Sequence, residues 1–225
     1  MSKSMSPAGR AWIAPALLLA LAVVPVAAGV ARLVWLGAGE IRPDSARFAA
    51  APAPLVLHIL SIFAFSLLGP FQFAAGGRGR RPAWHRAAGR AMALAGLVAA
   101  VTGLWMTQVY PPGVNDGDLL HGLRLVFGSA MAVSLLLGLD AVRRRDFARH
   151  RDWMMRAYAI GMGAGTQVIV YIPWLLLVGP VDERSRALLM GAGWAINLVV
   201  AEEIIRQRRG RATTPASGVN LASGA

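Results

Sequence analysis

The chain has 225 residues and contains no cysteine. This absence excludes disulfides, thiolate metal sites, iron–sulfur clusters and cysteine nucleophiles. Charged residues are also scarce, at 15% of the chain, and only 8% are aromatic, whereas 56% are hydrophobic and the mean hydropathy is +0.52. Because soluble domains average about 25% charged residues, this composition excludes a soluble enzyme and a disordered chain. It indicates an integral membrane protein.

Six apolar stretches are each close to the ~20 residues that a helix needs to cross a bilayer. The first has flanks typical of a signal peptide, but its apolar run is longer than a signal core, so we interpret it as a span. We therefore predict an all-α integral membrane fold: a cytoplasmic segment 1–11, a six-helix transmembrane domain 12–206 and a disordered tail 207–225. The predicted spans are 12–34, 54–76, 88–110, 119–142, 155–178 and 187–205.

The distribution of basic residues predicts the orientation of these spans. With the N-terminus inside, 17 of the 23 Lys and Arg residues fall on the inner side, and Arg124 falls within the fourth span. The positive-inside rule then places both termini on the cytoplasmic side of the membrane. The net charge of +12 is accounted for by this topology and by attraction to anionic lipids on the cytoplasmic side, so no nucleic acid partner is expected.

Glycines are spaced for close helix packing. Gly89, Gly96 and Gly103 are seven residues apart and share one stripe of the third span, and the fifth span carries a Gly-x-Gly-x-Gly run from 161 to 165. Such stripes let helix backbones approach closely in lipid, or make room for a flat cofactor. We expect spans two to five to form an antiparallel four-helix core that these glycines face, with spans one and six outside it.

The four histidines lie at or near the N-terminal ends of spans two to five. Because consecutive spans are antiparallel, His58 and His121 are predicted near the outer face, and His85 and His150 near the inner face. Two imidazoles from facing helices are the axial ligands that a b-type haem needs, so these four histidines are candidate metal ligands for one or two haems. The alternative is that interfacial histidines simply contact lipid phosphates.

Arginines near each histidine pair are candidate partners for the haem propionates. Arg124 is one turn from His121 on the same face, and Arg86 and Arg90 lie close to the inner pair. Arg124 is also the best case of a charge inside a span, which indicates function by default unless the side chain extends to the headgroups.

The motifs also resemble a known family. They are Leu57-His58, Gly69-Pro70-Phe71-Gln72-Phe73, His85-Arg86 with Gly89-Arg90, and Arg-Asp-Phe-x-x-His-Arg-x-Trp-Met-x-Arg-x-Tyr over 145–158. Over roughly 50–206 the chain resembles the bacterial predicted membrane proteins called domain of unknown function 2306. This resemblance implies a multi-span inner-membrane protein of no established activity. The alternate-helix histidines more distantly resemble the cytochrome b561-like two-haem group, although His85 and His150 lie at the surface rather than inside the spans.

Three functional hypotheses follow. The first is a membrane oxidoreductase, a b-type cytochrome that transfers electrons between a quinone or other redox partner and an acceptor. The second is a small transporter or lipid-interacting protein that uses Gln72 and Arg124, for which paired broken helices near the midplane are expected. The third is an accessory or structural subunit of a larger membrane complex. We also expect Glu202 to neutralise the arginine-rich inner rim, and Gln167 and Asn197 to form interhelical hydrogen bonds.

Overall fold

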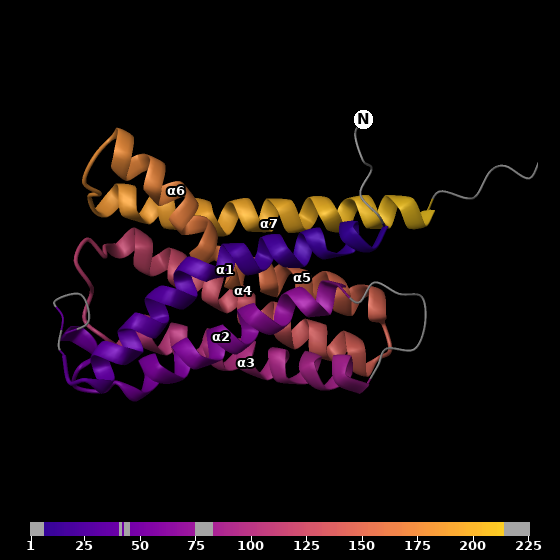
Figure 1. The fold of residues 1–225 in the computed structure, drawn as a ribbon, viewed down its shortest axis with the longest axis horizontal. Helices are drawn as coiled ribbons and strands as arrows, with labels where there is room; N and C mark the ends of the chain where they lie inside the picture. Colours follow the sequence, from indigo (N-terminus) through magenta and orange to yellow (C-terminus); the bar gives the residue numbers. More distant parts are fainter. Residues whose placement is uncertain (1–6, 41, 43–45, 75–82, 214–225) are drawn as a thin grey trace, which may run out of the picture.

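The computed structural model describes residues 7–40, 42, 46–74 and 83–213, and these residues fold into α-helices joined by short connections (Figure 1). Residues 1–6 of the predicted N-terminal segment and 214–225 of the predicted tail lie outside the described residues. The last helix continues to Thr213, so the prediction of disorder is wrong for residues 207–213. A 3-10 helix, η1 (Ala46–Phe48), precedes α2. The α-helices are α1 (Pro7–Gly37), α2 (Ala53–Ala74), α3 (Ala83–Val109), α4 (Asp118–Arg143), α5 (Phe147–Gly161), α6 (Gly163–Leu177) and α7 (Glu183–Thr213).

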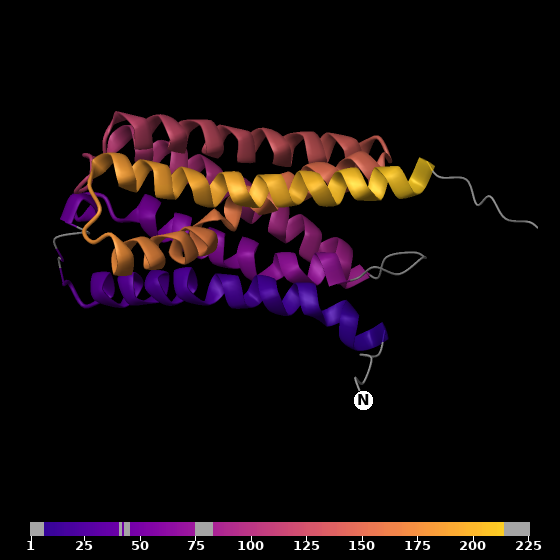
Figure 2. The same cartoon turned by 90° about the horizontal axis from the view of Figure 1, so that it is seen from above.

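The helices run roughly along one axis, so the molecule has two ends (Figures 1 and 2). At the proximal end, α1 begins, α2 gives way to α3, α4 to α5, and α7 ends. At the distal end lie the connections from α1 to α2, α3 to α4 and α6 to α7. The first helix therefore begins, and the last helix ends, at the same end of the molecule. This is expected when the chain crosses the membrane an even number of times. Which compartment the proximal end faces stays a prediction.

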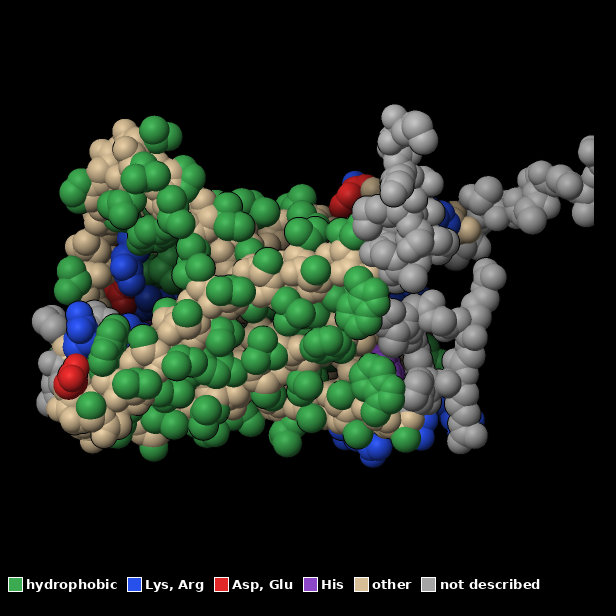
Figure 3. Space-filling model, viewed as in Figure 1, with side chains coloured by type: hydrophobic (Ala, Val, Ile, Leu, Met, Phe, Trp, Pro, Cys, Tyr) green, Lys and Arg blue, Asp and Glu red, His purple; other side chains and the backbone are tan. Residues whose placement is uncertain are grey.

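The surface between the two ends is suited to lipid. Five of the described helices are long and apolar enough to cross a membrane, and the number is six if the bent pair α5–α6 is counted as one span. Large apolar side chains such as Leu94 and Val126 are each 64% exposed. On the face drawn in Figure 3, hydrophobic side chains cover the middle, and charged side chains gather towards the ends. The prediction of a helical multi-pass membrane protein is confirmed.

The fifth span differs from the prediction. Instead of one helix over 155–178, it comprises α5 and α6, which meet at Met162 with a bend of 41°. Gly163 lies against the Trp194 ring of α7, and Gly165 lies against the backbone of Leu21 in α1, so even a methyl group at either position would clash. These contacts direct α6 away from the bundle and towards α1 and α7. Helices α2 to α5 form the predicted four-helix core, but α6 leaves it.

The interface between α2 and α3 confirms the expected role of the first glycine stripe. The three glycines of α3 each face one side chain of α2 at the same seven-residue spacing: Gly89 faces Gln72, Gly96 faces Phe65, and Gly103 faces His58. A methyl group added at these glycines would lie 3.3, 2.6 and 3.2 Å from those side chains, respectively. The glycines therefore admit larger side chains of α2, including the polar side chains of His58 and Gln72.

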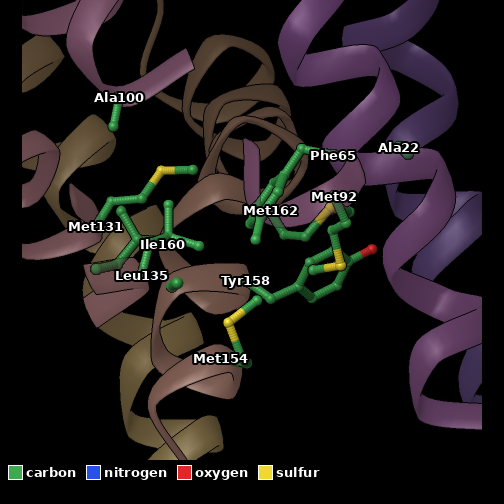
Figure 4. Close-up of a cluster of buried hydrophobic side chains, with 12 residues drawn as sticks. Ala22, Phe65, Met92, Ala100, Met131, Leu135, Met154, Tyr158, Ile160 and Met162 are labelled. Atoms are coloured by element: carbon green, nitrogen blue, oxygen red, sulfur yellow. The ribbon is translucent and has the colours of Figure 1, made fainter. Parts of the chain in front are cut away.

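Phe65 occupies the centre of the core (Figure 4). Its ring is fully buried, and it lies between Gly96 of α3 and Gly161 of α5, where an added methyl group would be 2.6 and 2.5 Å away. The surrounding buried side chains are Met92, Met131, Leu135, Met154, Tyr158, Ile160 and Met162. The glycine stripes were expected either to allow close packing or to make room for a flat cofactor. At mid-depth the structure shows close packing, because the Phe65 side chain fills the space beside Gly96 and Gly161.

A tyrosine of α5 donates a hydrogen bond in place of the one that a proline removes from α2. Pro70 has no N–H, so the carbonyl of Ser66 one turn earlier loses its helical donor. The Tyr158 hydroxyl donates to this carbonyl at 2.9 Å, and its ring lies against Gly69. Because an unpaired carbonyl is costly in a membrane, Tyr158 lets α2 continue through Pro70 to Ala74.

The expected polar contacts between helices are also present. The Gln167 side-chain amide donates to the Met190 carbonyl of α7 at 3.0 Å. Asn197 of α7 donates to the Ala159 carbonyl at 3.0 Å and accepts a hydrogen bond from Thr166 at 2.7 Å. These bonds tie α7 to both halves of the bent span.

Candidate functional site

Two of the four candidate haem ligands are anchored to a neighbouring helix by their Nδ1 atoms. His58 Nδ1 lies 2.9 Å from the Ala99 carbonyl, and His150 Nδ1 lies 2.8 Å from the Gly138 carbonyl. Because a carbonyl oxygen can only accept, Nδ1 carries a proton in both residues, and in the neutral ring Nε2 then holds the lone pair. Metal-ligating histidines commonly have this arrangement.

The predicted histidine pairs belong to helices that lie diagonally across the core. His58 and His121 stand on α2 and α4, and His85 and His150 on α3 and α5, at opposite ends of the molecule. His85 contacts the Trp84 ring edge-on, with centroids 5.8 Å apart. Among the described residues no group of three or more His, Asp or Glu side chains could hold a bare metal ion. The pairing around a haem therefore stays a prediction.

The arginines that follow His85 and flank His150 in the sequence separate into two groups. Arg90 lies exposed on α3, where its Nε donates to the Arg86 carbonyl at 3.3 Å. Arg149 and Arg151 instead line a groove between the start of α5 and the end of α7, and neither Arg86 nor Arg90 reaches it. The arginine-rich inner rim is thus not one surface.

This proximal groove has a volume of about 440 Å³ and is strongly basic. It contains five arginines against two aspartates, which gives a formal charge of +3. One aromatic side chain, Trp153, also borders it. The lining residues are Asp146, Ala148, Arg149, Arg151, Asp152, Trp153, Arg156, Arg208 and Arg209.

Two arginines of the proximal groove are held by carboxylates. Arg209 donates to Asp152 through two nitrogens, at 3.0 and 2.7 Å. Arg156 forms a two-pronged pair with Glu202, at 2.5 and 2.9 Å, and lies 4.6 Å from the centre of the Trp153 ring. The second pair confirms the expected role of Glu202. It also fixes the guanidinium of Arg156 at the wall of the groove.

The remaining groove arginines have no carboxylate partner among the described residues. Arg208 donates to the sulfur of Met155 at 3.4 Å. Arg149 and Arg151 are exposed in the first two turns of α5. The side chain of Asp146 does not pair with them, because it caps the helix by accepting from the backbone N–H of Arg149 at 3.0 Å. Three guanidinium groups therefore remain available to an anion.

A second arginine cluster forms at the distal end, around a single carboxylate. Asp116, in the connection between α3 and α4, has a side chain only 4% exposed. It accepts two hydrogen bonds from Arg124 at 2.8 and 3.1 Å, one from Arg47 at 3.2 Å and one from Arg186 at 3.0 Å. Arg124 is thus engaged by a carboxylate through two nitrogens, and its predicted role beside a haem at His121 stays a prediction. It pairs with a residue eight positions earlier.

Local backbone geometry places Asp116 at the centre of this cluster. Asn115 has a positive φ of 57° and Asp116 N–H donates to the Gly113 carbonyl at 3.0 Å, so the chain turns sharply after Pro112. The Gly113 N–H in return donates to the Asp116 carboxylate at 3.1 Å. This tight turn points the carboxylate back between α4, α7 and η1.

Burial and ion pairing act in opposite directions on Asp116. Burial raises the pKa of this carboxyl, but hydrogen bonds and charge from Arg124, with further contributions from Gly113 and Arg186, more than compensate, so the pKa falls well below its ordinary value. Burial also lowers the pKa of Arg47, although Asp116 opposes the change. Asp116 is therefore ionised at neutral pH, and the three arginines and one aspartate carry a formal charge of +2.

Comparison with known proteins identifies one family. A family model described as predicted membrane protein (DUF2306) matches residues 55–205, which covers α2 to α6 and most of α7. No curated protein and no solved structure matches the chain.

Proposed function

The chain belongs to the DUF2306 family of predicted membrane proteins, and we propose that it is a lipid-interacting protein that binds an anionic phospholipid at the proximal groove. The observation that carries this proposal is the groove of about 440 Å³ lined by five arginines, which keeps a formal charge of +2 when Glu202, the partner of Arg156, is counted with the two aspartates. Of the three hypotheses drawn from the sequence, this one uses side chains that the fold brings together from α5 and α7.

The chemistry of the groove suits a phosphate group. Guanidinium groups recognise phosphate oxygens through paired N–H donors, and they are weakly hydrated for a cation. Arg149, Arg151 and Arg208 supply such donors without a competing carboxylate. Arg156 and Arg209 are already oriented by Glu202 and Asp152, so less side-chain entropy is lost when they bind.

The position of the groove favours a lipid as the source of the phosphate. It lies at the proximal end of the apolar surface, where the headgroup layer of one leaflet would be. Trp153 borders it, and tryptophan is enriched at membrane interfaces. The basic residues of the sequence predict that this leaflet is the cytoplasmic one, whose anionic lipids attract such segments by about 1 kcal/mol per arginine.

The proposal is tested by binding of phosphatidylglycerol to the purified protein in uncharged detergent, with phosphatidylcholine as the zwitterionic reference. The wild type should bind phosphatidylglycerol more tightly. In the triple variant Arg149→Gln, Arg151→Gln, Arg208→Gln the affinity should fall about 100-fold, since three contributions of about 1 kcal/mol each are lost.

Arg144→Gln is the matched control. Arg144 is an exposed arginine in the adjacent turn, paired with Asp140 at 2.8 Å and outside the groove. This variant should bind phosphatidylglycerol as the wild type does. A loss of binding free energy in the control equal to one third of that in the triple variant would mean that each surface arginine acts alike through general basicity, and the proposal would fail.

Haem binding stays a second proposal, supported by the Nδ1 hydrogen bonds of His58 and His150. These bonds leave Nε2 of each residue with the lone pair that iron requires. A visible spectrum of protein purified from cells grown with a haem precursor tests the proposal. A Soret band lost in His58→Ala or His150→Ala supports it, and its absence from the wild type contradicts it.

A further inference from the structure

Three buried polar atoms at the distal end have no hydrogen-bond partner among the described residues. They are the hydroxyl of Tyr171, the indole Nε1 of Trp174 and Nε of Arg47, each of which is inaccessible to solvent. Buried polar groups are nearly always paired, so each such atom needs an explanation. The indole and guanidinium nitrogens can only donate, and the tyrosine hydroxyl can donate. A ligand that pairs with the two donors of α6 must therefore offer an acceptor.

The pairing of α6 with α7 places two of these atoms at the level of the distal arginine cluster. Gln167 bonds to Met190 and lies against Gly193, which sets the antiparallel register of the two helices. Tyr171 and Trp174 follow four and seven positions after Gln167, so they share its helix face. Continuing the register puts both residues opposite the first turn of α7, where Arg186 donates to Asp116.

The bend at Met162 opens the fold at this same end. Helix α6 diverges from α7 towards the distal end in both views (Figures 1 and 2). Between α6 and α1 the surface is hollowed, and basic and acidic side chains are visible inside (Figure 3). Because α1 and α6 carry exposed apolar residues such as Val34 and Leu176, this hollow opens sideways towards lipid.

At the distal end the arginines outnumber the nearby carboxylates, and this excess of positive charge favours binding of an anion. Asp116 is shared by Arg47, Arg124 and Arg186. Glu183 lies against Gly117 beside the cluster, and even when it is counted the arginines remain in excess. A cluster that served only to join the loops would not require the additional unpaired donors on α6.

We propose that this distal hollow binds the oxyanion headgroup of a singly charged amphiphile, a carboxylate or phosphodiester on an apolar chain, which enters between α1 and α6. The headgroup accepts hydrogen bonds from Trp174 Nε1, the Tyr171 hydroxyl and the free nitrogens of Arg186. Its chain lies along the exposed apolar residues of α1 and α6. This site is separate from the proximal groove and does not depend on it.

The test uses the full chain in uncharged detergent with ¹⁵N-labelled indole nitrogens, and Trp174→Phe assigns the Trp174 signal. Laurate is the probe, dodecanol is its neutral counterpart, and acetate is the same anion without a chain. Laurate should shift the Trp174 N–H signal saturably, whereas dodecanol and acetate at equal concentration should not. In Tyr171→Phe and Arg186→Gln the laurate affinity should fall about tenfold, as expected for loss of a hydrogen bond to a charged group.

Two variants control the measurement. Trp105→Phe changes an exposed tryptophan of α3 and should bind laurate as the wild type does. The triple variant of the proximal groove should also keep the laurate response, so failure at one end is distinguishable from failure at the other. No saturable shift, an equal shift with dodecanol or acetate, or unchanged affinity in Tyr171→Phe would each overturn the proposal. Tyr171→Phe removes only a hydroxyl, so folding is not at issue.

Discussion

The two ends of the molecule use arginine in different ways. At the distal end, three arginines converge on one buried carboxylate and are themselves between 22% and 32% exposed. At the proximal end, five arginines line an open groove, and three of them have no carboxylate partner among the described residues. The distal arginines join three separate segments of chain, whereas the proximal ones leave their donors accessible from the surface.

This difference shows that arginine count alone does not identify a binding surface. An arginine bound to a buried carboxylate contributes to stability, because removing either partner leaves an unpaired buried charge. An exposed arginine contributes little to stability but remains free for an external anion. Substitutions at the distal end should therefore change unfolding, and those at the proximal end should change lipid binding.

The largest effect is expected for Asp116→Asn. The change removes the charge that three arginines share, and losing one partner of a buried ion pair costs about 3–5 kcal/mol. Detergent-induced unfolding of the purified protein measures the free energy. The matched proximal variant is Asp152→Asn, whose partner Arg209 is 65% exposed, so a loss of about 1 kcal/mol or less is expected. Equal losses would remove the distinction between the two ends.

The next largest difference between the two ends should be their response to salt. Raising the ionic strength from about 0.05 to 0.5 M shortens the screening length severalfold, and phosphatidylglycerol affinity at the exposed proximal groove should fall about tenfold. Unfolding of the wild type should change little, because the Asp116 cluster is buried. Lipid titrations and unfolding curves at both salt concentrations provide the check. Lipid affinity that does not respond to salt would argue against the arginine groove.

Replacing arginine by lysine should lower the stability of the fold at the distal end and leave it nearly unchanged at the proximal end. Arg124→Lys cannot keep both hydrogen bonds to Asp116, so it should destabilise the fold by about 1–2 kcal/mol. Arg208→Lys keeps the charge of an exposed groove residue and should leave stability within about 0.5 kcal/mol. A destabilisation by Arg208→Lys as large as that by Arg124→Lys would contradict this assignment.

The smallest effect concerns pH. The pKa of Asp116 is lower in the folded protein than the ordinary value near 4, so its contribution to stability is complete above that value. The contribution is lost as pH falls towards the folded-state pKa. Unfolding free energy should therefore be flat from about pH 8 to pH 5 as far as Asp116 is concerned, and decline below about pH 4. Asp116→Asn should show a weaker decline. An identical acid response in both proteins would mean that other carboxylates dominate.

Much of the fold was predictable from the sequence because it follows from local periodicity. The seven-residue spacing of Gly89, Gly96 and Gly103 predicted a packed face, and the matching side chains of α2 fill it. The bend at Met162 was not predictable. It depends on contacts of Gly163 and Gly165 with α7 and α1, and a Gly-x-Gly-x-Gly run is equally compatible with a straight packed helix.

The candidate sites were predictable only in part. Arg124 was recognised because a charge within an apolar stretch is costly. Its partner Asp116 precedes the start of α4 and reaches Arg124 only through the tight turn at 113–116. The proximal groove depends on the pairing of Asp152 with Arg209, 57 residues later. The basic residues at the start of α5 were visible in the sequence, but they do not identify a partner helix.

The most direct test of the proposed function is native mass spectrometry of the protein released from bilayers that contain equal amounts of phosphatidylglycerol and phosphatidylcholine. The account predicts that the wild type and Arg144→Gln retain phosphatidylglycerol preferentially, and that the Arg149→Gln, Arg151→Gln, Arg208→Gln variant retains the two lipids equally. Preferential retention of phosphatidylglycerol by the triple variant, at the level of the wild type, would contradict lipid binding at the proximal groove.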